Sequence, residues 1–588
     1  MCGISGFNFK DESLIKKMNA LLAHRGPDAG GFYVGENISL GHRRLSIIDL
    51  SEAGAQPMSD ANGRYWITFN GEIYNFQELR RKLEGKYKFR SQTDTEVIIY
   101  SYMEWGRDCL KKFNGIFSFA IWDKNKEELF LARDPAGVKP LYYYFDGKEL
   151  IFASEIKAIL EAGVPREIDF EAFNLYFRLL YVPAPFTMFK NIRKLLPGSY
   201  LVFGGDKLDI KKYWEINDFR EYESYDEAKA DIEKIIKDSV CLQLVSDRSV
   251  GVFLSGGIDS TAILGMAREL APQVTKTFSI GFDIFEESEK FNADFKLARE
   301  TAKFYGADHH ELLMSGRDAA EVLEAAVWHM DEPVANPTVL PTFLLSRETK
   351  KEVAVVLGGD GGDELFGGYL RHYYAHLAGN YLEWLPKNME AAAMKMIIAK
   401  FNSQKINKIK SIILPAVYSG QSFKNFLNTN FVHAKNDFSR EFMLFDLKTW
   451  LPDESLVRTD KMTMAHGLEQ RVPILDLRLM ECAFKVSSKW KIDNKAIGKK
   501  IWRDAVEKYL PPHIRGEKKR GWFSPAAKWL RKEMKDAVYE SFGDLDNDLF
   551  NKQECLHILD KHVSQKEYNL NIVWALFVWQ IWKKIYKL

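Results

Sequence analysis

Cys2 directly follows the initiator methionine, so removal of Met1 would leave one residue that carries both a thiol and a free α-amine. An α-amine titrates at about pH 7.7 to 8.0 and can take the proton of the thiol, directly or through a water. The thiolate formed in this way is a strong nucleophile. A cysteine near a chain end is also compatible with an ordinary small residue, so this chemistry needs the support of other residues.

Four further segments follow Cys2 in order along the chain. They are "HRGPDAGG" (24–31), "GHRRLSIIDL" (41–50), "FNGEIYN" (69–75) and "SQTDTEVI" (91–98). Together with Cys2 they resemble the class II glutamine amidotransferases, a family of N-terminal nucleophile enzymes. The resemblance implies that Cys2 attacks the side-chain amide of glutamine and gives a thioester and ammonia.

The same resemblance assigns roles to individual residues. The side-chain amide of Asn70 and the backbone N–H of Gly71 would form the oxyanion hole, where glycine lets the backbone approach the developing charge. The implied glutamine site consists of Arg44, Ile47, Glu72 and Asp94. Glutamine carries one charge of each sign, which Arg44 and Asp94 can match. By themselves, Asn-Gly between apolar runs predicts a hairpin turn, and Arg44 and Asp94 predict surface charges.

A second glycine-containing pattern, Ser255-Gly256-Gly257, ends an apolar run and precedes Asp259 and Ser260. Backbone N–H groups exposed by glycines, together with the positive end of a following helix, can hold a phosphate without a lysine. A strand-to-helix turn without a ligand would also carry glycines, and the spacing of a Walker A loop is missing. The pattern S-G-G-x-D-S resembles the PP-loop of enzymes that cleave ATP between its α- and β-phosphates, which implies that Asp259 helps to hold Mg²⁺.

A third stretch, "VAVVLGGDGGDELFGGYLRH" (353–372), again follows an apolar run and supplies Asp360, Asp363 and Glu364. Ends of parallel strands meet at one edge of a sheet, so we expect both glycine-rich loops to surround a single ATP. Carboxylates beside a triphosphate repel it unless a cation lies between them, which predicts Mg²⁺ with Asp259 and Asp363 as ligands. The alternative is a pair of solvated loop carboxylates.

The elements that must position these residues fall into two groups. As far as about residue 205 the chain shows short β-rich segments separated by turns. Beyond residue 224, helical spacing at 225–244 gives way to apolar runs at 251–254, 277–281 and 353–357, a pattern typical of a parallel sheet covered by helices. From about residue 375 the chain is mostly helical in pattern. The dipeptides Pro197-Gly198 and Gly204-Gly205 punctuate a connector and predict a boundary, with domains at 1–205 and 206–588.

Over essentially its whole length the sequence resembles the glutamine-dependent asparagine synthetases. Further segments carry this resemblance: "PAPFTMFKNIRKLLPGSYL", "FSIGF", "HMDEPVANPTVLPTFLLS", "LVRTDKMTMAHGLEQRVPILD" and "KKRGWFSPAAKWLR". The implied fold has two domains. The first is an αββα sandwich of the N-terminal-nucleophile hydrolases, and the second is a parallel-sheet PP-loop domain, of the adenine nucleotide alpha hydrolase type, with added helices.

Site residues in the second domain follow from the resemblance. Asp360 and Lys519 match positions linked to the acyl-adenylate and amide-forming steps, whereas Arg471 and Asp476 are compatible with purely structural roles. Lys519, within the basic run 518–520, is also compatible with a solvated charge patch. The residues expected around ATP are Leu254, Ser255, Gly256, Gly257, Asp259, Ser260, Ser279, Gly281, Gly358 and Gly359.

The resemblance implies a sequence of three events: hydrolysis of glutamine at Cys2, passage of ammonia through the interior, and attack on a β-aspartyl-adenylate. A shielded passage is reasonable because ammonia in neutral water is protonated and loses its nucleophilic lone pair. The substrates are then glutamine, ATP and a carboxylate acceptor, with aspartate favoured and Mg²⁺ as cofactor. A homologue that has lost its glutaminase is disfavoured because Cys2 and "NGE" are intact. The same residues disfavour a non-catalytic regulatory or storage protein.

Two positions depart from the family pattern and leave the acceptor open. The second loop has Asp360 where G-E-G-[AS]-D-E is usual, so this acid is one methylene shorter. "DEPVANPT" has Asn336 where an aspartate is frequent. A catalytic carboxylate must come within hydrogen-bond reach of the group it serves, so a shorter one moves the substrate or changes it. The alternative acceptor is a sugar (uronic) acid, as in relatives of surface-polysaccharide clusters.

Composition excludes some classes of partner. Among 588 residues, 82 Lys and Arg balance 81 Asp and Glu, so we expect neither nucleic-acid nor membrane-surface binding.

The five cysteines are far apart and form no CxxC pair, which favours a reducing, cytoplasmic compartment. The start of the chain lacks the features of a signal peptide, and the apolar run 572–579 is too short to span a bilayer and predicts a buried helix. A homodimer is compatible with the sequence.

Overall fold

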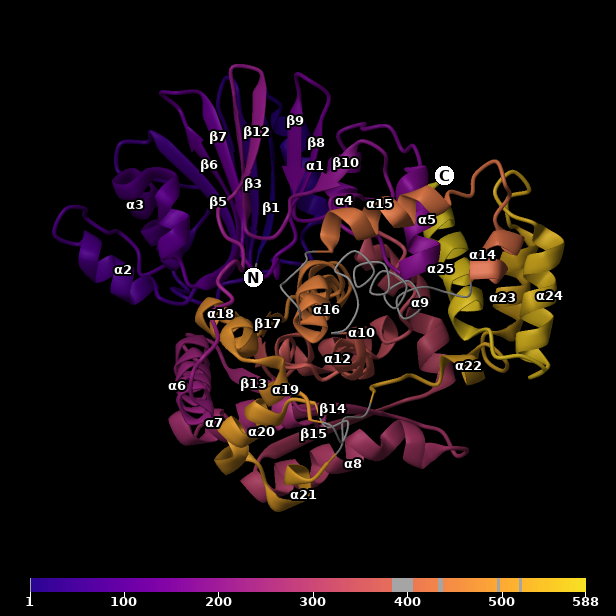
Figure 1. The fold of residues 1–588 in the computed structure, drawn as a ribbon. Helices are drawn as coiled ribbons and strands as arrows, with labels where there is room; N and C mark the ends of the chain where they lie inside the picture. Colours follow the sequence, from indigo (N-terminus) through magenta and orange to yellow (C-terminus); the bar gives the residue numbers. More distant parts are fainter. Residues whose placement is uncertain (1, 383–405, 432–436, 494–497, 518–520) are drawn as a thin grey trace.

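The computed structural model describes the chain except for residues 1, 383–405, 432–436, 494–497 and 518–520. The described residues form two domains with three sheets, two in the N-terminal domain and one in the C-terminal domain. In Figure 1 the N-terminal strands fan out above the C-terminal sheet, and the chain start lies between the two domains.

The N-terminal domain contains two six-stranded sheets that pack face to face, with β1 and β3 of one sheet against β5 of the other. The first has the order β10 (Ile192–Lys194), β8 (Tyr142–Phe145), β9 (Leu150–Ala153), β1 (Gly3–Phe7), β3 (Ser39–Arg44) and β2 (Ala29–Val34). The second has the order β12 (Lys207–Lys212), β11 (Ser199–Gly204), β7 (Glu128–Arg133), β6 (Gly115–Asp123), β5 (Tyr65–Ile73) and β4 (Met58–Ser59).

Helices cover the outer faces of the two sheets. α1 (Glu12–Leu21) packs on β1 and β3 together with α4 (Ile156–Leu160), while α3 (Asp94–Trp105) packs on β5 beside α2 (Phe76–Leu83). The layers are therefore αββα, as predicted. β11 and β12 form a hairpin that ends at Lys212, with Gly204 and Lys207 paired across its turn.

The C-terminal domain is built on a parallel sheet with the order β15 (Asp308–Met314), β14 (Lys276–Phe282), β13 (Val250–Phe253), β16 (Val355–Leu357) and β17 (Glu469–Arg471). The three apolar runs predicted as strands are β13, β14 and β16. Their side chains are mostly buried on both faces, which explains the lack of alternation in the sequence.

Helices enclose both faces of this sheet. α6 (Tyr225–Gln243), α7 (Ile258–Leu270) and α8 (Ser288–Tyr305) share one apolar core with β13, while α10 (Val339–Thr349) packs on the opposite face against β14. The helix predicted at 225–244 is α6. The next helices along the chain are α9 (Gly316–Met330), α11 (Gly362–Phe366), α12 (Leu370–Leu382), α14 (Ile406–Ile412), α15 (Gly420–Asn430), α16 (Phe438–Lys448), α17 (Leu456–Met464) and α18 (Leu477–Lys485).

The last part of the chain is helical, as its pattern predicted. It contains α19 (Ser488–Lys491), α20 (Lys500–Val506), α21 (Pro512–Arg515), α22 (Ala526–Trp529), α23 (Lys535–Gly543), α24 (Lys552–Val563) and α25 (Leu570–Tyr586). α5 (Phe170–Leu179), from the end of the N-terminal domain, packs in the same apolar core as α25. The run 572–579 is a buried segment of α25, and none of the described helices has the length and hydropathy of a membrane span.

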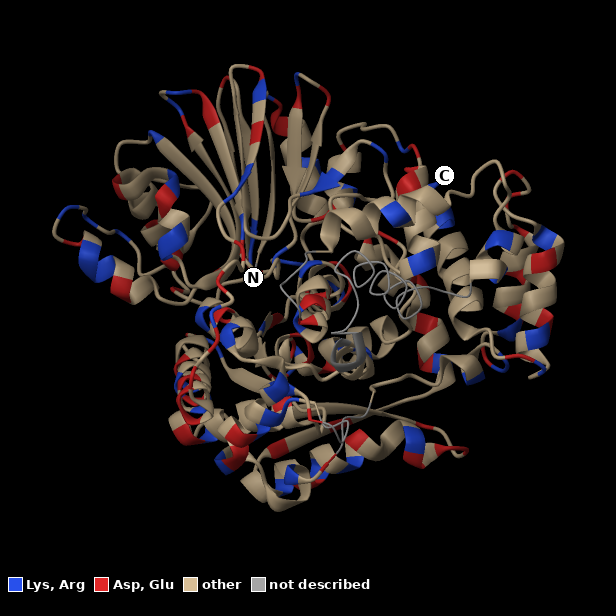
Figure 2. Ribbon diagram, viewed as in Figure 1, with Lys and Arg blue, Asp and Glu red and all other residues tan. Residues whose placement is uncertain are grey.

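Charged residues of both signs are interspersed over the ribbon (Figure 2). This distribution agrees with the near-zero net charge of the sequence.

Candidate functional site

The sheet packing of the N-terminal domain places Cys2 at the start of β1, in the middle of its sheet. The backbone nitrogen of Cys2 donates to Oδ1 of Asn70, at 2.9 Å. Its Sγ lies 4.0 Å from the carbonyl oxygen of Leu45, the neighbour of Arg44. The thiol is buried, and this burial raises its pKa. A base close to the thiol is therefore needed to form the thiolate.

Asn70 and Gly71 lie on β5, which pairs with β6. Gly71 has φ of +150°, and a Cβ there would come within 2.1 Å of the carbonyl oxygen of Ile116, so no other residue fits. The side-chain nitrogen of Asn70 has a long contact of 3.4 Å with Oγ of Ser118. The predicted hairpin turn is thus not formed at Asn-Gly, because the chain continues as a strand to Ile73.

The four residues predicted to bind glutamine are all buried in this domain: Arg44, Ile47, Glu72 and Asp94. The guanidinium of Arg44 donates to the carbonyl oxygen of Ser51 at 2.7 Å and to that of Asp49. The backbone nitrogen of Ile73 donates to Oδ2 of Asp94 at 2.8 Å. These contacts hold one cation and one acid in fixed orientations beneath the surface.

Asp94 begins α3, where Thr93 caps the helix through the backbone nitrogen of Glu96. A carboxylate in the first turn is favoured by the helix dipole. Burial nevertheless dominates and raises the pKa of Asp94 to about 7, with the negative charge of Glu469 acting in the same direction. The carboxyl group therefore changes its charge close to neutral pH.

Arg471 lies at the boundary between the domains. Its guanidinium donates to Oε1 of Glu469 at 2.6 Å and lies 3.4 Å from Oε1 of Glu72. Asp476 caps α18 through the backbone nitrogen of Arg478 and accepts a hydrogen bond of 2.8 Å from Asn114. Both residues therefore contact the N-terminal domain at the interface, Arg471 through Glu72 and Asp476 through Asn114.

The PP-loop lies between β13 and α7. Gly256 has φ of +76°, and a Cβ there would lie 2.3 Å from the carbonyl oxygen of Asp294 on α8, so the packing of the domain requires a glycine. Gly257 is the N-cap of α7 and is exposed. Among the described residues, a Cβ at Gly257 would meet Ser255 Oγ at 3.4 Å, an ordinary contact. Protein packing therefore does not explain this second glycine.

The hydroxyls of the loop lie together. Oγ of Ser260 accepts from the backbone nitrogen of Ser255 at 3.2 Å and lies 3.1 Å from Oγ of Ser255. Leu254 is buried behind them. The start of α7 has no side-chain cap among the described residues, so its first N–H groups face the loop opening with the positive end of the helix.

The two glycine-rich loops touch, as the sequence predicted. A Cβ at Gly359 would lie 3.0 Å from both Cβ of Asp259 and the backbone nitrogen of Ser260, and one at Gly362 would lie 2.7 Å from Oδ1 of Asp259. Glycine at these two positions lets the second loop pack on the first. Gly358 lies beneath the side chains of Asp360 and Gln470.

A lysine that the sequence interpretation missed joins the two loops. Nζ of Lys499 lies 2.6 Å from Oδ2 of Asp259 and 2.8 Å from Oδ1 of Asp363. The other oxygen of Asp259 accepts from Nε1 of Trp502 at 2.9 Å. Asp259 and Asp363 therefore converge on one position, which a cationic group occupies.

The remaining predicted nucleotide residues lie on β14. Oγ of Ser279 lies 3.0 Å from Nε2 of His309, whose other ring nitrogen lies 2.8 Å from Oγ1 of Thr277. Gly281 accommodates the ring of Phe295, which a Cβ would approach to 2.9 Å. Lys519 lies outside the described residues.

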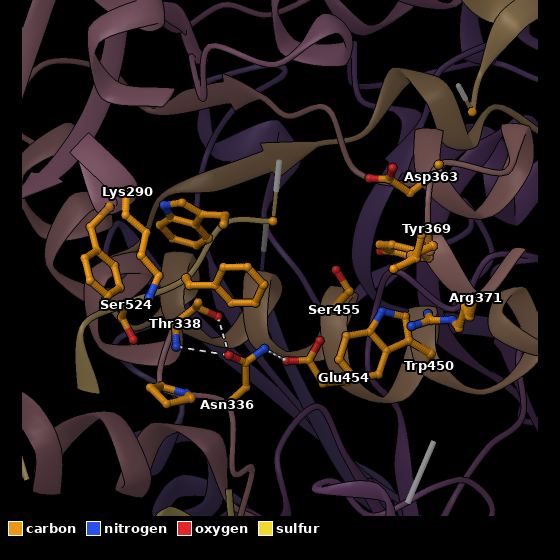
Figure 3. Close-up of a pocket in the computed structure, with 18 of the residues that line it drawn as sticks. Lys290, Asn336, Thr338, Asp363, Tyr369, Arg371, Trp450, Glu454, Ser455 and Ser524 are labelled. Atoms are coloured by element: carbon orange, nitrogen blue, oxygen red, sulfur yellow. Dashed lines mark hydrogen bonds between the residues drawn. The ribbon is translucent and has the colours of Figure 1, made fainter. Parts of the chain in front are cut away.

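A cavity of about 1670 Å³ opens beside the second loop, with Asp363 in its wall (Figure 3). On its floor Nδ2 of Asn336 donates to Oε1 of Glu454 at 2.7 Å, and the guanidinium of Arg458 donates to the same oxygen at 2.9 Å. The side chain and backbone of Thr338 donate to Oδ1 of Asn336 at 2.8 and 3.1 Å. Asn336 thus joins a network that requires its amide group.

The cavity wall also carries aromatic rings, including those of Trp450 and Tyr369, with the guanidinium of Arg371 over the ring of Tyr369 at 4.2 Å. Ligand sites of small molecules usually have volumes of roughly 300–1,000 Å³. This cavity therefore has room for two ligands. The aromatic and cationic groups of its wall were not singled out from the sequence, because isolated Trp, Tyr and Arg residues carry no spacing signal.

Between the domains lies a buried network of ion pairs. Arg25 contacts Asp460 at 2.8 Å and Glu155 at 3.0 Å, and Lys157 contacts Asp331 at 2.7 Å. The members are Arg25, Lys139, Glu155 and Lys157 from the N-terminal domain, with Asp331, Asp460 and Lys461 from the C-terminal domain. Removing one partner of a buried pair costs about 3–5 kcal/mol, so this network fixes one domain against the other.

Comparison with known sequences agrees with this architecture. Residues 231–584 match the sequence model of asparagine synthase, and residues 1–214 match that of a glutamine amidotransferase domain. The chain belongs to the asparagine synthase family. The resemblance inferred from the motifs and the two-domain fold are thereby confirmed.

The chain is similar to several curated proteins over nearly its whole length. It is 35% identical to "Asparagine synthetase [glutamine-hydrolyzing] 1" of Bacillus subtilis, across 100% of this chain and 97% of that protein. It is 33% identical to a "Putative asparagine synthetase [glutamine-hydrolyzing]" of Mycobacterium bovis, across 98% and 94%. It is 27% identical to "Amidase chry2" of Gibberella zeae, across 95% and 96%. Proteins with different names thus resemble this chain over nearly its whole length.

Proposed function

We propose that the protein is a glutamine-hydrolysing asparagine synthetase. It would convert ATP, L-aspartate, L-glutamine and water into AMP, diphosphate, L-asparagine and L-glutamate. The observation that carries this proposal is the contact between two glycine-rich loops at the sheet edge, beside a cavity with room for a nucleotide and an acceptor. The similarity to proteins named asparagine synthetases supports the choice of acceptor.

In the glutaminase half-reaction, Cys2 acts after removal of Met1. Its free α-amine takes the proton of the thiol, and the thiolate attacks the amide carbon of glutamine. Asn70 and Gly71 donate to the oxygen that becomes negative. The carbon–nitrogen bond breaks, ammonia leaves with the transferred proton, and water hydrolyses the thioester to glutamate. The backbone nitrogen of Cys2 already lies 2.9 Å from Oδ1 of Asn70, which would hold this amine in place.

In the synthetase half-reaction, a carboxylate of the acceptor attacks the α-phosphorus of ATP, and diphosphate leaves. The N–H groups at Gly257 and at the start of α7 would bind the departing phosphates. The space at Gly257 supports this role, because packing among the described residues leaves the position free for a ligand. Lys499 lies at the edge of the same loop, where an ammonium group can neutralise diphosphate charge.

Two carboxylates of the site fit Mg²⁺ as ligands. Asp259 and Asp363 supply hard oxygen ligands that converge within reach of one point, held here by the ammonium of Lys499. Among the described residues there is no group of three or more metal-binding side chains, so phosphate oxygens and waters would complete the shell. Bound there, Mg²⁺ would neutralise charge on the phosphates, and Lys499 would turn toward the diphosphate.

For amide formation, ammonia attacks the acyl carbon of the adenylate, loses a proton and displaces AMP. Asp360 is half-buried at the second loop, and this burial raises the pKa of its carboxyl group. A carboxylate with a raised pKa is better matched to accept a proton at neutral pH. We assign this proton transfer to Asp360, and Lys519 is proposed to act on the adenylate.

A second candidate acceptor is a sugar acid. The volume of the cavity and its aromatic wall favour a carboxylate larger than aspartate, since sugar rings pack well on aromatic faces. The similarity to a relative named an amidase also supports a broader range of acceptors within the family.

The deciding experiment offers single acceptors to the purified protein with ATP, Mg²⁺ and glutamine. Acceptor-dependent release of diphosphate is measured together with the amide product. We expect both with aspartate, in a ratio of one to one. Release of diphosphate with aspartate but without asparagine contradicts the primary proposal, and release with a uronic acid alone establishes the second candidate.

A further inference from the structure

Strand β17 lies at the edge of the parallel sheet and at the boundary between the two domains. It pairs with β16, so that Gln470 is opposite Val356 and Arg471 is opposite Leu357. Side chains alternate along a strand. Arg471 and Glu469 therefore point to one side, where Arg471 reaches Glu72 of the glutaminase domain, and Gln470 points to the other.

On that other side Gln470 contacts the second glycine-rich loop. Its Nε2 donates a hydrogen bond of 2.6 Å to Oδ2 of Asp360. Gln470 is only 5% exposed, whereas Asp360 lies partly open to the site. The buried amide can therefore hold the more accessible carboxylate in one orientation through this hydrogen bond.

Gly358 makes this contact possible. A Cβ at position 358 would lie 2.1 Å from Nε2 of Gln470 and 2.9 Å from Oδ2 of Asp360. Any side chain there would separate the two groups. The glycine that the sequence assigned to nucleotide binding is therefore required by the amide and the carboxylate above it.

The lengths of the two side chains are complementary. The side chain of Asp360 is short, and the carboxamide of Gln470 fills the space next to its carboxylate. A glutamate at position 360 would place its carboxyl group into the volume that the amide occupies, because the two groups are already at hydrogen-bond distance.

We propose that Gln470 is the positioning residue for Asp360, and that the two side chains form a length-matched pair that sets the carboxylate for amide formation. This inference rests on the proposed function, in which Asp360 accepts a proton from the attacking ammonia. Gln470 acts through Asp360 and does not itself contact a substrate. Arg458 also acts on Asp360 by its positive charge and belongs to the same surroundings.

A double-mutant cycle tests the pair, with Asp360→Glu, Gln470→Ala and the combined variant. Each single variant is expected to lose about 10²-fold in the rate of amide formation, since a misplacement of about 1 Å has this effect. In Gln470→Ala, acceptor-dependent diphosphate release and glutaminase activity should stay unchanged. In the combined variant the longer acid has room, and amide formation should recover most of the loss.

A matched control is Gln243→Ala, which removes another buried glutamine of the same domain, whose Nε2 donates to Oγ of Ser239. It should leave amide formation unchanged. If the losses of the two single variants multiply in the combined variant, the pair is not matched in length and the inference is overturned.

A crystal structure of the Gln470→Ala variant separates this inference from the proposed function. We expect the carboxylate of Asp360 to leave the position that it has beside Gln470. An unmoved carboxylate overturns the positioning role for any acceptor. Absence of amide formation by the wild-type protein with every acceptor, together with a moved carboxylate, instead contradicts the proposed function.

Discussion

The two sites differ in how much of each is fixed by the protein alone. The glutaminase residues are buried in one domain, and Gly71 fits there because the carbonyl of Ile116 leaves no room for a side chain. The synthetase site is assembled from loops and helices far apart in the sequence, and it borders a cavity of about 1670 Å³. At Gly257 the residues that the structure describes leave space that their own packing does not use.

This difference follows from the chemistry proposed for each site. The proposed glutaminase reaction uses one small substrate, so buried groups of a single domain can match its charges and its oxyanion. The synthetase must bind a nucleotide and an acceptor, and the charges of these substrates pair with the charged groups of the site. Its acids are held meanwhile by cations of the protein, as Lys499 holds Asp259 and Asp363.

Loss of the nucleophile should separate the two sites most clearly. Cys2→Ala should lower glutaminase activity on the order of 10⁶-fold, the scale seen when a covalent nucleophile is removed. Amide synthesis from added ammonium should remain, because the synthetase site is intact. Release of glutamate and formation of amide from ammonium are measured side by side. Cys241→Ala, at an exposed cysteine of α6, is the control. Unchanged glutaminase activity in Cys2→Ala contradicts the assignment.

Removal of the charge at the PP-loop should have the opposite effect. Asp259→Asn should reduce diphosphate release by about 10²- to 10³-fold, since the charge that organises Lys499 and the phosphates is lost. Glutamate release should remain measurable. The control is Asp238→Asn, which alters an exposed pair with Arg478. Equal loss of both activities would show that the two sites are not independent.

The buried carboxyl group of Asp94 predicts a pH dependence of glutamine binding. Its pKa is raised to about 7, so it is neutral below this pH and cannot hold the amine of glutamine. The KM for glutamine should therefore rise by up to about tenfold for each pH unit below pH 7 and level off above it. Asp94→Asn should bind glutamine weakly at every pH, without this dependence of KM. A wild-type KM that is constant from pH 6 to pH 8 excludes this role.

The two glycines of the PP-loop should respond differently to an added methyl group. Gly256→Ala should lower the free energy of unfolding by about 1–2 kcal/mol or more, because its φ is positive and Asp294 is too close. Gly257→Ala should change stability by less than about 1 kcal/mol yet raise KM for ATP. Denaturant unfolding and steady-state kinetics check the two effects. Equal loss of stability in both variants would mean that Gly257 is also a packing residue.

Much of the architecture could be predicted from the sequence because its signals are local. The runs at 251–254, 277–281 and 353–357 are strands, since apolar segments of this length become buried on both faces in a parallel sheet. The domain boundary at residues 205 and 206 stays a prediction, because glycine-containing dipeptides mark any turn, and Gly204-Gly205 stands at the turn between β11 and β12.

What the sequence determined by itself is the class of chemistry: a thiol beside a free amine, glycines where backbones approach charge, and acids next to them. These are properties of neighbouring residues, so they can be read along the chain. Only the tertiary structure brought Lys499 to the two loops, Arg471 to Glu72, and Gln470 to Asp360. Contacts between residues more than 100 positions apart depend on the pairing of strands and the packing of domains, which leaves no local pattern in the sequence.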